Sequence, residues 1–198
     1  MSNRILTIGH SNHPIDAFLT LLKNHHIEAV VDTRSHPKSK YAPQYDSANL
    51  RQSLRESGID YLYLGKELGG RPDGAHFYDA DGHVFYDRVA ESGFFLEGLR
   101  RLEERVQKFT LALLCSEENP SVCHRRLLIA RVMKQRGFAV HHIRADGRVE
   151  SEEELVSKEA DRSIDDTQLA LFDNSRVPEW KSIPSVLPRR RQSSSSAS

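Results

Sequence analysis

Residues 109–143, FTLALLCSEENPSVCHRRLLIARVMKQRGFAVHHI, decide the fold class of this chain. They begin with an apolar run, Phe109–Leu114, and end with another, Phe138–Ile143, and both are typical of buried strands. Between the runs, Pro120 suits the first turn of a helix, and Gly137 suits its end. A strand, a helix and a strand in this order predict a βαβ unit with parallel strands. Because Phe109–Leu114 is the most apolar run, we expect it at the centre of the sheet.

The N-terminal part of the chain repeats this alternation. Three further strands are predicted at Arg4–Ile8, Ile27–Val31 and Ile59–Leu64. Helices are predicted between the strands: one opened by Pro14, one ending at Gly58 and one from about Phe94 to Lys108. We therefore expect an α/β domain with an open, mostly parallel, doubly wound (Rossmann-like) sheet of about five strands. Right-handed crossovers favour the order 3-2-1-4-5, which puts the ends of the first and fourth strands side by side.

Composition limits the classes of protein that the chain can represent. Its 198 residues suffice for one domain of ordinary size, or for one domain and a tail. The 28 Lys and Arg residues equal the 28 Asp and Glu residues, which argues against a uniformly basic nucleic-acid coat but not against local basic patches. No run reaches the roughly 18–20 apolar residues of a membrane span. Without a signal-peptide pattern, and with only two cysteines, the chain is expected in the cytoplasm.

The composition changes after about Arg148. Residues 151–160 suggest one acidic helix, and from Ile164 onward three prolines interrupt any periodicity before the chain ends in RRRQSSSSAS. Such composition is typical of a segment that cannot bury enough apolar surface to fold. We therefore predict an α/β domain over residues 1–163 and a disordered tail over residues 164–198.

Unusual polar residues follow the predicted strands at their carboxyl ends, and these ends share one edge of a parallel sheet. They therefore predict a single site. The residues expected to act as catalytic groups are Cys123, His124, Asp32 and His10. Those expected to bind a substrate or an anion are Ser11, Arg34, Lys66, Glu67, Cys115 and Arg125.

The segment CSEENPSVCHRR, residues 115–126, leaves three interpretations open. Cys123 at a helix start beside His124 and Arg125 favours a lowered thiol pKa and a role as nucleophile or redox group. Alternatively, Cys115, Cys123 and His124 are soft metal ligands, with His10 in a wider set. The third interpretation is that both cysteines are small buried apolar residues. The spacing is neither that of the cysteine phosphatase loop nor C-x-x-C, and it matches no common zinc pattern. The sequence therefore assigns neither a metal nor a cofactor.

The loop after the second strand also allows two interpretations. Asp32 and Arg34 suit either an ion pair that shapes the pocket or a general acid/base next to an anion clamp. The residues that follow mix cations with Tyr41 and Tyr45, as in loops that hold phosphates and stack on bases. The same composition is equally typical of a solvated surface loop.

The chain resembles the domain-of-unknown-function family 488. The matching stretches are TIGHS, VVDTRSHPKSK, YLYLGKELGG and LALLCSEENPSVCHR, together with the apolar strand that follows, and they span roughly residues 4–146. The resemblance implies an α/β domain and one shared site. It implies no reaction, and it leaves the polar residues at the strand ends as candidates without assigned roles.

A second resemblance lies in the predicted tail. Gln168, Leu169, Leu171 and Phe172 match the short motif Gln-Leu-x-Leu-Phe, by which bacterial replication and repair proteins bind the DNA polymerase sliding clamp. An extended peptide can place two apolar anchors in a pocket while the glutamine bonds at its edge. We therefore expect a protein of DNA metabolism or repair that acts on or binds a nucleic acid or nucleotide and is tethered to the clamp. The alternatives are a small-molecule enzyme that uses a reactive cysteine or a metal, and a non-catalytic module that binds a phosphate or a base.

Overall fold

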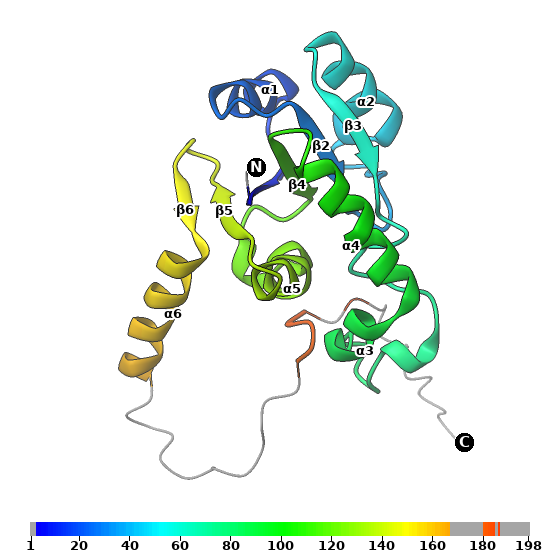
Figure 1. Ribbon diagram of the computed structural model, residues 1–198, viewed down its shortest axis with the longest axis vertical. Helices are drawn as coiled ribbons and strands as arrows, with labels where there is room; N and C mark the ends of the chain where they lie inside the picture. The colour runs from blue at the N-terminus through cyan, green and yellow to red at the C-terminus, as the bar shows by residue number, and fades with distance from the viewer. Residues whose placement is uncertain (1–2, 167–179, 185, 187–198) are drawn as a thin grey trace, which may run out of the picture.

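The computed structural model describes residues 3–166, 180–184 and 186 (Figure 1). Its centre is one six-stranded sheet in the order β3-β2-β4-β1-β5-β6. The strands are β1 (Arg4–Gly9), β2 (Ala29–Asp32), β3 (Asp60–Tyr63), β4 (Leu111–Cys115), β5 (Ala139–Ile143) and β6 (Val149–Ser151). The first five are parallel, and β6 pairs with β5 in the antiparallel sense. The mixed α/β, mostly parallel fold expected from the sequence is confirmed.

The strand order differs in one respect from the expected order of 3-2-1-4-5. β4 lies between β2 and β1, so β4 and β1 have exchanged places relative to the expected order. Burial of the two strands does not distinguish the orders, because β1 and β4 are both almost entirely buried and each has two neighbours in either order. The order instead depends on packing between distant segments. The expectation that the most apolar strand occupies the centre is confirmed, as is the pairing of β1 with β4.

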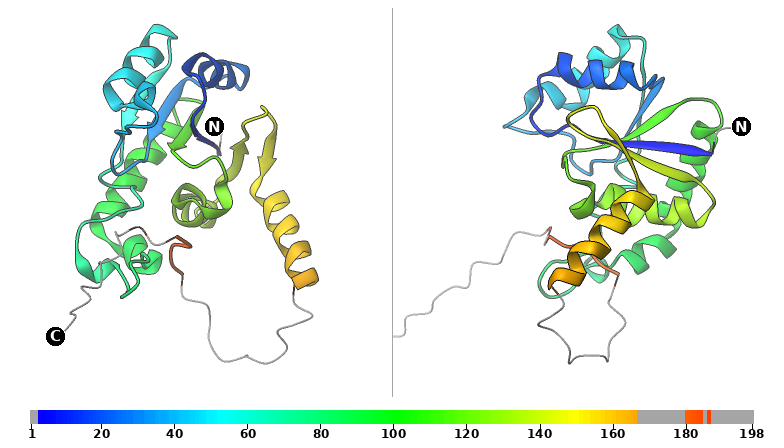
Figure 2. Two further views of the ribbon diagram at one scale, coloured as in Figure 1. Left: turned by 180° about the vertical axis from the view of Figure 1, so that it is seen from behind. Right: turned by 90° about the vertical axis from the view of Figure 1, so that its left-hand side faces the viewer.

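Helices cover both faces of the sheet, as Figures 1 and 2 show. One face carries α1 (Ile15–Asn24) and α2 (Ser47–Glu56), and the other carries α4 (Gly93–Val106) and α5 (Arg131–Gln135). Because side chains alternate along a strand, Ala112 and Leu114 pack towards α1 and α2. Leu111 and Leu113 pack towards α4 and α5. The other α-helices of the described residues are α3 (Tyr86–Glu91) and α6 (Glu152–Asp166).

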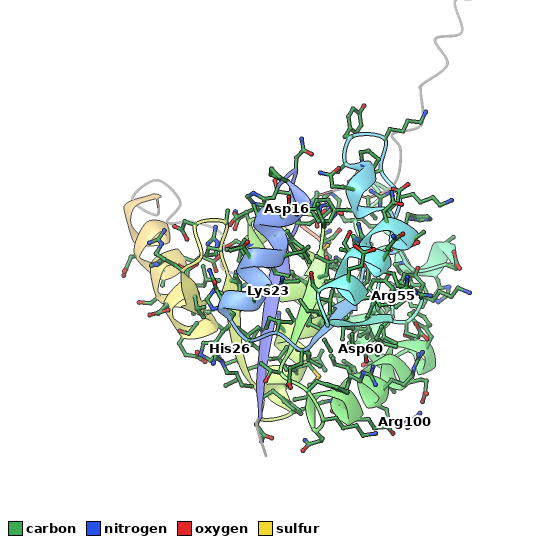
Figure 3. The ribbon with its side chains drawn as sticks, turned by 90° about the horizontal axis from the view of Figure 1, so that it is seen from above. Asp16, Lys23, His26, Arg55, Asp60 and Arg100 are labelled. Carbon is green, nitrogen blue, oxygen red and sulfur yellow. The ribbon has the colours of Figure 1, made fainter. Side chains whose placement is uncertain are left out.

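Charged residues lie on the outer faces of the covering helices. Figure 3 looks onto α1 and α2 and labels Asp16, Lys23 and Arg55 among the exposed side chains. On the inner face of α1, Phe18 and Leu22 are fully buried. The helices are thus amphipathic, as the spacing of their apolar residues predicts.

The helix expected from Pro120 to Arg136 is divided into three parts. A short 3₁₀ helix, η3 (Pro120–Val122), is followed by π-helical turns at η4 (Arg125–Ala130) and then by α5. Cys123 and His124 lie at the break between η3 and η4. The break leaves Cys123 in an extended conformation, with a φ of −107° and a ψ of 139°, rather than inside a first helical turn.

The C-terminal part of the chain contributes to the domain beyond the expected boundary at residue 163. Helix α6 runs to Asp166, and the described residues 180–184 pack beside α3 and α5 (Figures 1 and 2). Trp180 donates a hydrogen bond from Nε1 to the carbonyl oxygen of Leu127 at 2.8 Å, and Lys181 forms a β-bridge with Phe85. The expected tail therefore includes at least one segment that packs on the domain. The reason is the large apolar ring of Trp180, which gains free energy by burial.

The segment Gln168–Phe172, which the sequence predicts to bind the sliding clamp, lies outside the described residues. Within the described part of the chain, no helix combines the length and the apolar character needed to cross a membrane.

Candidate functional site

A polar pocket of about 410 Å³ lies at the carboxyl-terminal edge of the sheet. The loop after β4 contributes Cys115 and Glu117 to its lining, and the loop after β2 contributes Arg34. Further lining residues come from the loop after β3, from α3 and from the C-terminal segment, and they include Arg71, Tyr86 and Ser182. The strand ends thus form one site, as parallel topology predicts.

Four side chains with metal-binding or nucleophilic chemistry meet in this pocket. The ligand atoms of Cys115, Glu117, Cys123 and His124 all lie within 4.8 Å of one another. His124 Nδ1 lies 3.6 Å from Cys115 Sγ and 3.9 Å from Cys123 Sγ. Glu117 Oε2 accepts a hydrogen bond from Cys115 Sγ at 2.7 Å and lies 3.2 Å from Cys123 Sγ. Both cysteines are buried free thiols, whereas Glu117 is exposed.

The ring of His124 is fixed from the opposite side. Its Nε2 donates a hydrogen bond to the carbonyl oxygen of Thr33 at 3.1 Å, so Nδ1 is the nitrogen that faces the thiols. Gly70 lies against the ring, and a Cβ added at residue 70 would come within 2.8 Å of the ring carbon Cγ. The absence of a side chain at Gly70 therefore lets the imidazole occupy this place.

The two thiols have opposite electrostatic environments. Burial, followed by the proximity of Cys123, raises the pKa of Cys115 well above its ordinary value. Burial also opposes ionisation of Cys123, but the hydrogen bond from Cys115 and the positive charge of Arg125 outweigh it and lower the pKa of Cys123. The pair therefore favours one thiolate, at Cys123, next to one thiol. In the absence of a metal, such a thiolate beside His124 is a candidate nucleophile.

Arg34 reaches the pocket wall from a buried network. Its Nε and Nη2 donate to the two carboxylate oxygens of Asp32, at 2.9 and 2.7 Å. Its Nη1 donates to His10 Nε2 at 3.1 Å, and Tyr61 Oη donates to Asp32 at 2.8 Å. Since a guanidinium carries five N–H groups, two remain to face a ligand. This geometry supports the interpretation of Asp32 and Arg34 as an ion pair that shapes the pocket.

His10 contacts Arg34 within this buried network. Its Nδ1 donates to the carbonyl oxygen of Ser11 at 2.7 Å, and its ring stacks on Tyr45 with the centroids 4.1 Å apart. Burial and the adjacent Arg34 lower the pKa of His10 to about 4, so the ring is neutral at neutral pH. Neither His10 nor Asp32 lines the pocket as the described residues form it. In this structure both residues contact Arg34 behind the pocket lining, and the catalytic roles expected for them stay a prediction.

Arg125 is fully buried and holds the loop that carries Glu117. It donates to the backbone carbonyl oxygens of Glu117 and Glu118, the latter at 2.6 Å. The same loop passes so close to β1 that a Cβ at Gly9 would lie 1.8 Å from the Glu117 carbonyl oxygen. Arg125 therefore holds the loop in place and lies outside the pocket lining, and the expectation that it binds an anion stays a prediction.

Three other expected binding residues lie outside the pocket. Lys66 is exposed at the start of the loop after β3, and Glu67 forms an ion pair with Arg101 of α4. The backbone N–H of Ser11 donates to the carbonyl oxygen of Ser116 at 2.9 Å, which ties two strand ends together. Of the ten residues expected at the domain site, the structure places Arg34, Cys115, Cys123 and His124 in the pocket lining.

Sequence reasoning missed several pocket residues. Glu117 follows β4 by two residues and has the composition of an ordinary solvated loop, although its C-x-E spacing from Cys115 was a usable signal. Lys38 belongs to the cationic loop that was noted as a phosphate-binding candidate. Arg71 and Ser182 join the lining through long-range packing, for which the sequence has no local signal.

Comparison with known proteins places the chain in a family. Neither the curated proteins nor the solved structures gave a match. The family model described as "Domain of unknown function DUF488" matches residues 14–132, which cover more than half of the chain and include the loop after β2, both cysteines and His124. The chain therefore belongs to the DUF488 family.

Proposed function

We propose that this protein is an enzyme of DNA metabolism that binds a nucleotide or the phosphate-bearing end of a nucleic acid in the strand-end pocket. One observation carries the proposal: the cationic side chains of Arg34, Lys38 and Arg71 line the same pocket as the cluster of two cysteines, a glutamate and a histidine. Cationic side chains of this kind bind phosphate, and the cluster supplies nucleophilic or metal-binding groups beside it.

The charges of the pocket suit an anion. Among the residues that the structure describes, Lys38 and Arg71 form no ion pair, and both are exposed. Arg34 is held rigidly by Asp32 and retains two N–H groups. A ligand phosphate can thus contact the rigidly held Arg34 and the flexible side chains of Lys38 and Arg71 without breaking an existing ion pair.

Size and aromatic residues favour a nucleotide over a bare phosphate. A cavity of about 410 Å³ is within the range of pockets that hold small organic ligands. Tyr41, on the same loop as Lys38, has 91% of its side chain exposed, which is unusual for a large aromatic residue. Exposed aromatic rings next to cations are typical of surfaces on which bases stack. Tyr45, in contrast, is fully buried and packs on His10.

The binding test uses isothermal titration calorimetry with a deoxynucleoside 5′-monophosphate and with a short single-stranded oligonucleotide. Lys38→Ala and Arg71→Ala should each weaken binding of the monophosphate by about tenfold, through loss of a charge-assisted contact. Lys66→Ala removes an equally exposed lysine outside the pocket and should leave the affinity unchanged. Tyr41→Ala should weaken binding of the oligonucleotide more than binding of the monophosphate.

The proposal fails if neither ligand binds, or if Lys66→Ala weakens binding as much as Lys38→Ala. Ligand binding without turnover of any phosphate-bearing substrate would instead favour the non-catalytic binding module.

The cellular context proposed here rests on the tail sequence. The match of Gln168–Phe172 to the clamp-binding motif supports a tether to the DNA polymerase sliding clamp and hence a role in replication or repair. A cytoplasmic location is part of the same proposal, since the clamp acts there in bacteria. A small-molecule enzyme that uses the cysteine cluster is the alternative if the tether does not exist.

A further inference from the structure

We propose that Cys115, Cys123 and His124 bind a Zn²⁺ ion at the floor of the pocket, with Glu117 on the solvent side of the metal. Metal binding itself does not depend on the proposed function. Only the role of the metal, which is to polarise an oxygen of the bound nucleotide or a water beside it, rests on that function.

The spacing of the three inner ligand atoms fits a tetrahedral ion. Zn–S bonds of about 2.3 Å and Zn–N bonds of about 2.1 Å place sulfur and nitrogen ligands about 3.6 Å apart. The observed distances from His124 Nδ1 to the sulfur atoms of Cys115 and Cys123 are 3.6 and 3.9 Å. The ligands therefore need little rearrangement to close around the ion.

The orientation of His124 is the one that a metal requires. A metal-bound imidazole normally donates its other N–H to a carbonyl or carboxylate, which fixes the ring and its tautomer. Here Nε2 donates to the carbonyl oxygen of Thr33, so Nδ1 is the nitrogen that faces the two sulfur atoms and would bind the metal. This second-layer contact is independent of the cysteines themselves.

The cluster is built from separate parts of the chain that hold it firmly. Cys115 ends the central strand β4, whereas Cys123 and His124 lie at the break between η3 and η4. Arg125 fixes the backbone of Glu117 and Glu118 between them. Both cysteines are at most 3% exposed, so the thiols are held in a preformed site. Zinc binds both sulfur atoms as thiolates, so the thiol proton that remains on Cys115 is released to solvent, and no oxidation state changes.

Glu117 differs from Cys115, Cys123 and His124 in its exposure to solvent. It is exposed, and its Oε2 lies 2.7 and 3.2 Å from the two sulfur atoms, which are hydrogen-bond distances for a thiol and a carboxylate. Three inner ligands of the Cys₂His type leave the fourth position of a zinc ion open towards solvent. Glu117 is therefore the residue beside the open position, where it can orient a water or a ligand oxygen.

The test measures metal binding to the full chain without any nucleotide. Zn²⁺ is titrated in competition with a chelating dye, and Co²⁺ is titrated with detection of its absorption spectrum. We expect one equivalent of metal, with the near-ultraviolet charge-transfer bands of thiolate-bound Co²⁺ and the intense visible bands of tetrahedral coordination. This spectrum needs no variant, so it tests the site even if a cysteine substitution prevents folding.

Variants then assign the ligands. Cys115→Ser, Cys123→Ser and His124→Ala should each abolish the stoichiometric site, whereas Glu117→Gln should retain it with an affinity reduced by about 10- to 100-fold. The matched control is His36→Ala, which removes another histidine of the pocket lining that lies outside the cluster and should bind zinc as the wild type does.

Two results would overturn the proposal: failure of wild-type protein to bind a stoichiometric metal, or a Co²⁺ spectrum without thiolate bands. Retention of full affinity in Cys123→Ser would also overturn it. Failure of the nucleotide to bind would leave these results intact and would count against the proposed function alone. Lys38→Ala should lower nucleotide affinity but not zinc affinity, and this difference separates the two proposals.

Discussion

Asp32 is the residue on which the position of Arg34 depends. The Asp32 side chain is 0% accessible to solvent. Its two carboxylate oxygens accept hydrogen bonds from Arg34 and Tyr61. Burying two charges is costly, but removing one partner is costlier, because the other charge stays buried without compensation. The ion pair thus provides geometry more than net stability.

A pair of substitutions tests this account of Asp32. Asp32→Asn should lower the free energy of unfolding by about 3–5 kcal/mol, because it leaves the guanidinium of Arg34 buried without a carboxylate. Tyr61→Phe removes one hydrogen bond to the same carboxylate and should cost only about 1 kcal/mol. Urea unfolding followed by circular dichroism measures both. Equal effects of the two substitutions would contradict a central role for the ion pair.

His142 predicts a pH dependence of stability. It is buried between Thr7 and Glu152, and burial lowers its pKa from 6.5 in spite of the hydrogen bond to Glu152, while Arg125 and Arg126 also oppose its protonation. As the pH falls below 6.5, the unfolded chain therefore binds a proton before the folded one does. The contribution of His142 to the free energy of unfolding is therefore fully present above pH 6.5. It is lost as the pH falls towards the pKa of His142 in the folded protein.

Comparison of the wild type with His142→Gln isolates this contribution. The free energy of unfolding of the wild type should fall between pH 6.5 and pH 5 more steeply than that of the variant. Glutamine can still bond to Thr7 and Glu152 but does not titrate. Parallel curves for the two proteins over this interval would contradict the assignment.

At the scale of elements, the C-terminal segment around Trp180 closes one side of the pocket. The Trp180 ring packs on Tyr86 with the centroids 6.2 Å apart, and the guanidinium of Arg131 lies 4.4 Å above it. Two residues later, Ser182 enters the pocket lining, and its backbone N–H donates to the Val84 carbonyl oxygen at 2.9 Å. Trp180 thus anchors the segment that brings Ser182 into the pocket lining.

Trp180→Ala should loosen this segment and lower the free energy of unfolding by about 2 kcal/mol. It should also weaken nucleotide binding and accelerate hydrogen exchange at the Tyr86 amide, which donates to the Trp180 carbonyl oxygen at 2.8 Å. Trp180→Phe keeps an aromatic ring but loses the bond to Leu127, so an intermediate effect is expected. Unchanged exchange at Tyr86 in the alanine variant would show that the segment does not cover α3.

The clamp-binding motif makes a prediction for an isolated peptide. A flexible peptide loses conformational entropy when it docks, so a peptide of residues 165–174 should bind a bacterial sliding clamp with a dissociation constant on the order of micromolar. Leu171→Ala together with Phe172→Ala should abolish binding of the intact protein without unfolding it, because these residues are the apolar anchors that we expect to dock on the clamp. Calorimetry that detects no binding of the intact wild type would remove the support for a replication or repair role.

The sheet shows which features the sequence could predict. Apolar runs and helical spacing gave the parallel strands, the covering helices and the central place of β4, since each depends on local pattern. The exchange of β1 and β4 was not predictable, because strand order depends on packing between distant segments. α3 and β6 were missed for another reason: both are short, and neither has a clear apolar period.

The candidate site could also be predicted only in part from the sequence. Cys115, Cys123 and His124 were predictable, because strand ends converge in a parallel sheet and these residues lie at one such end. Arg125 and His10 were placed in the right region, but neither lines the pocket, since sequence cannot distinguish a residue that faces a pocket from one that supports its wall. Arg71 depends on how the loop after β3 folds back, so no local pattern indicates its role.

The cationic side chains and the proposed zinc ligands lie in one pocket. The most direct test of this account is a crystal structure of the protein grown with Zn²⁺ and a nucleoside monophosphate, with anomalous diffraction measured on both sides of the zinc edge. We predict an anomalous peak bonded to Cys115, Cys123 and His124, and a phosphate in contact with Arg34. A zinc peak elsewhere, or a nucleotide bound away from this pocket, would contradict the account.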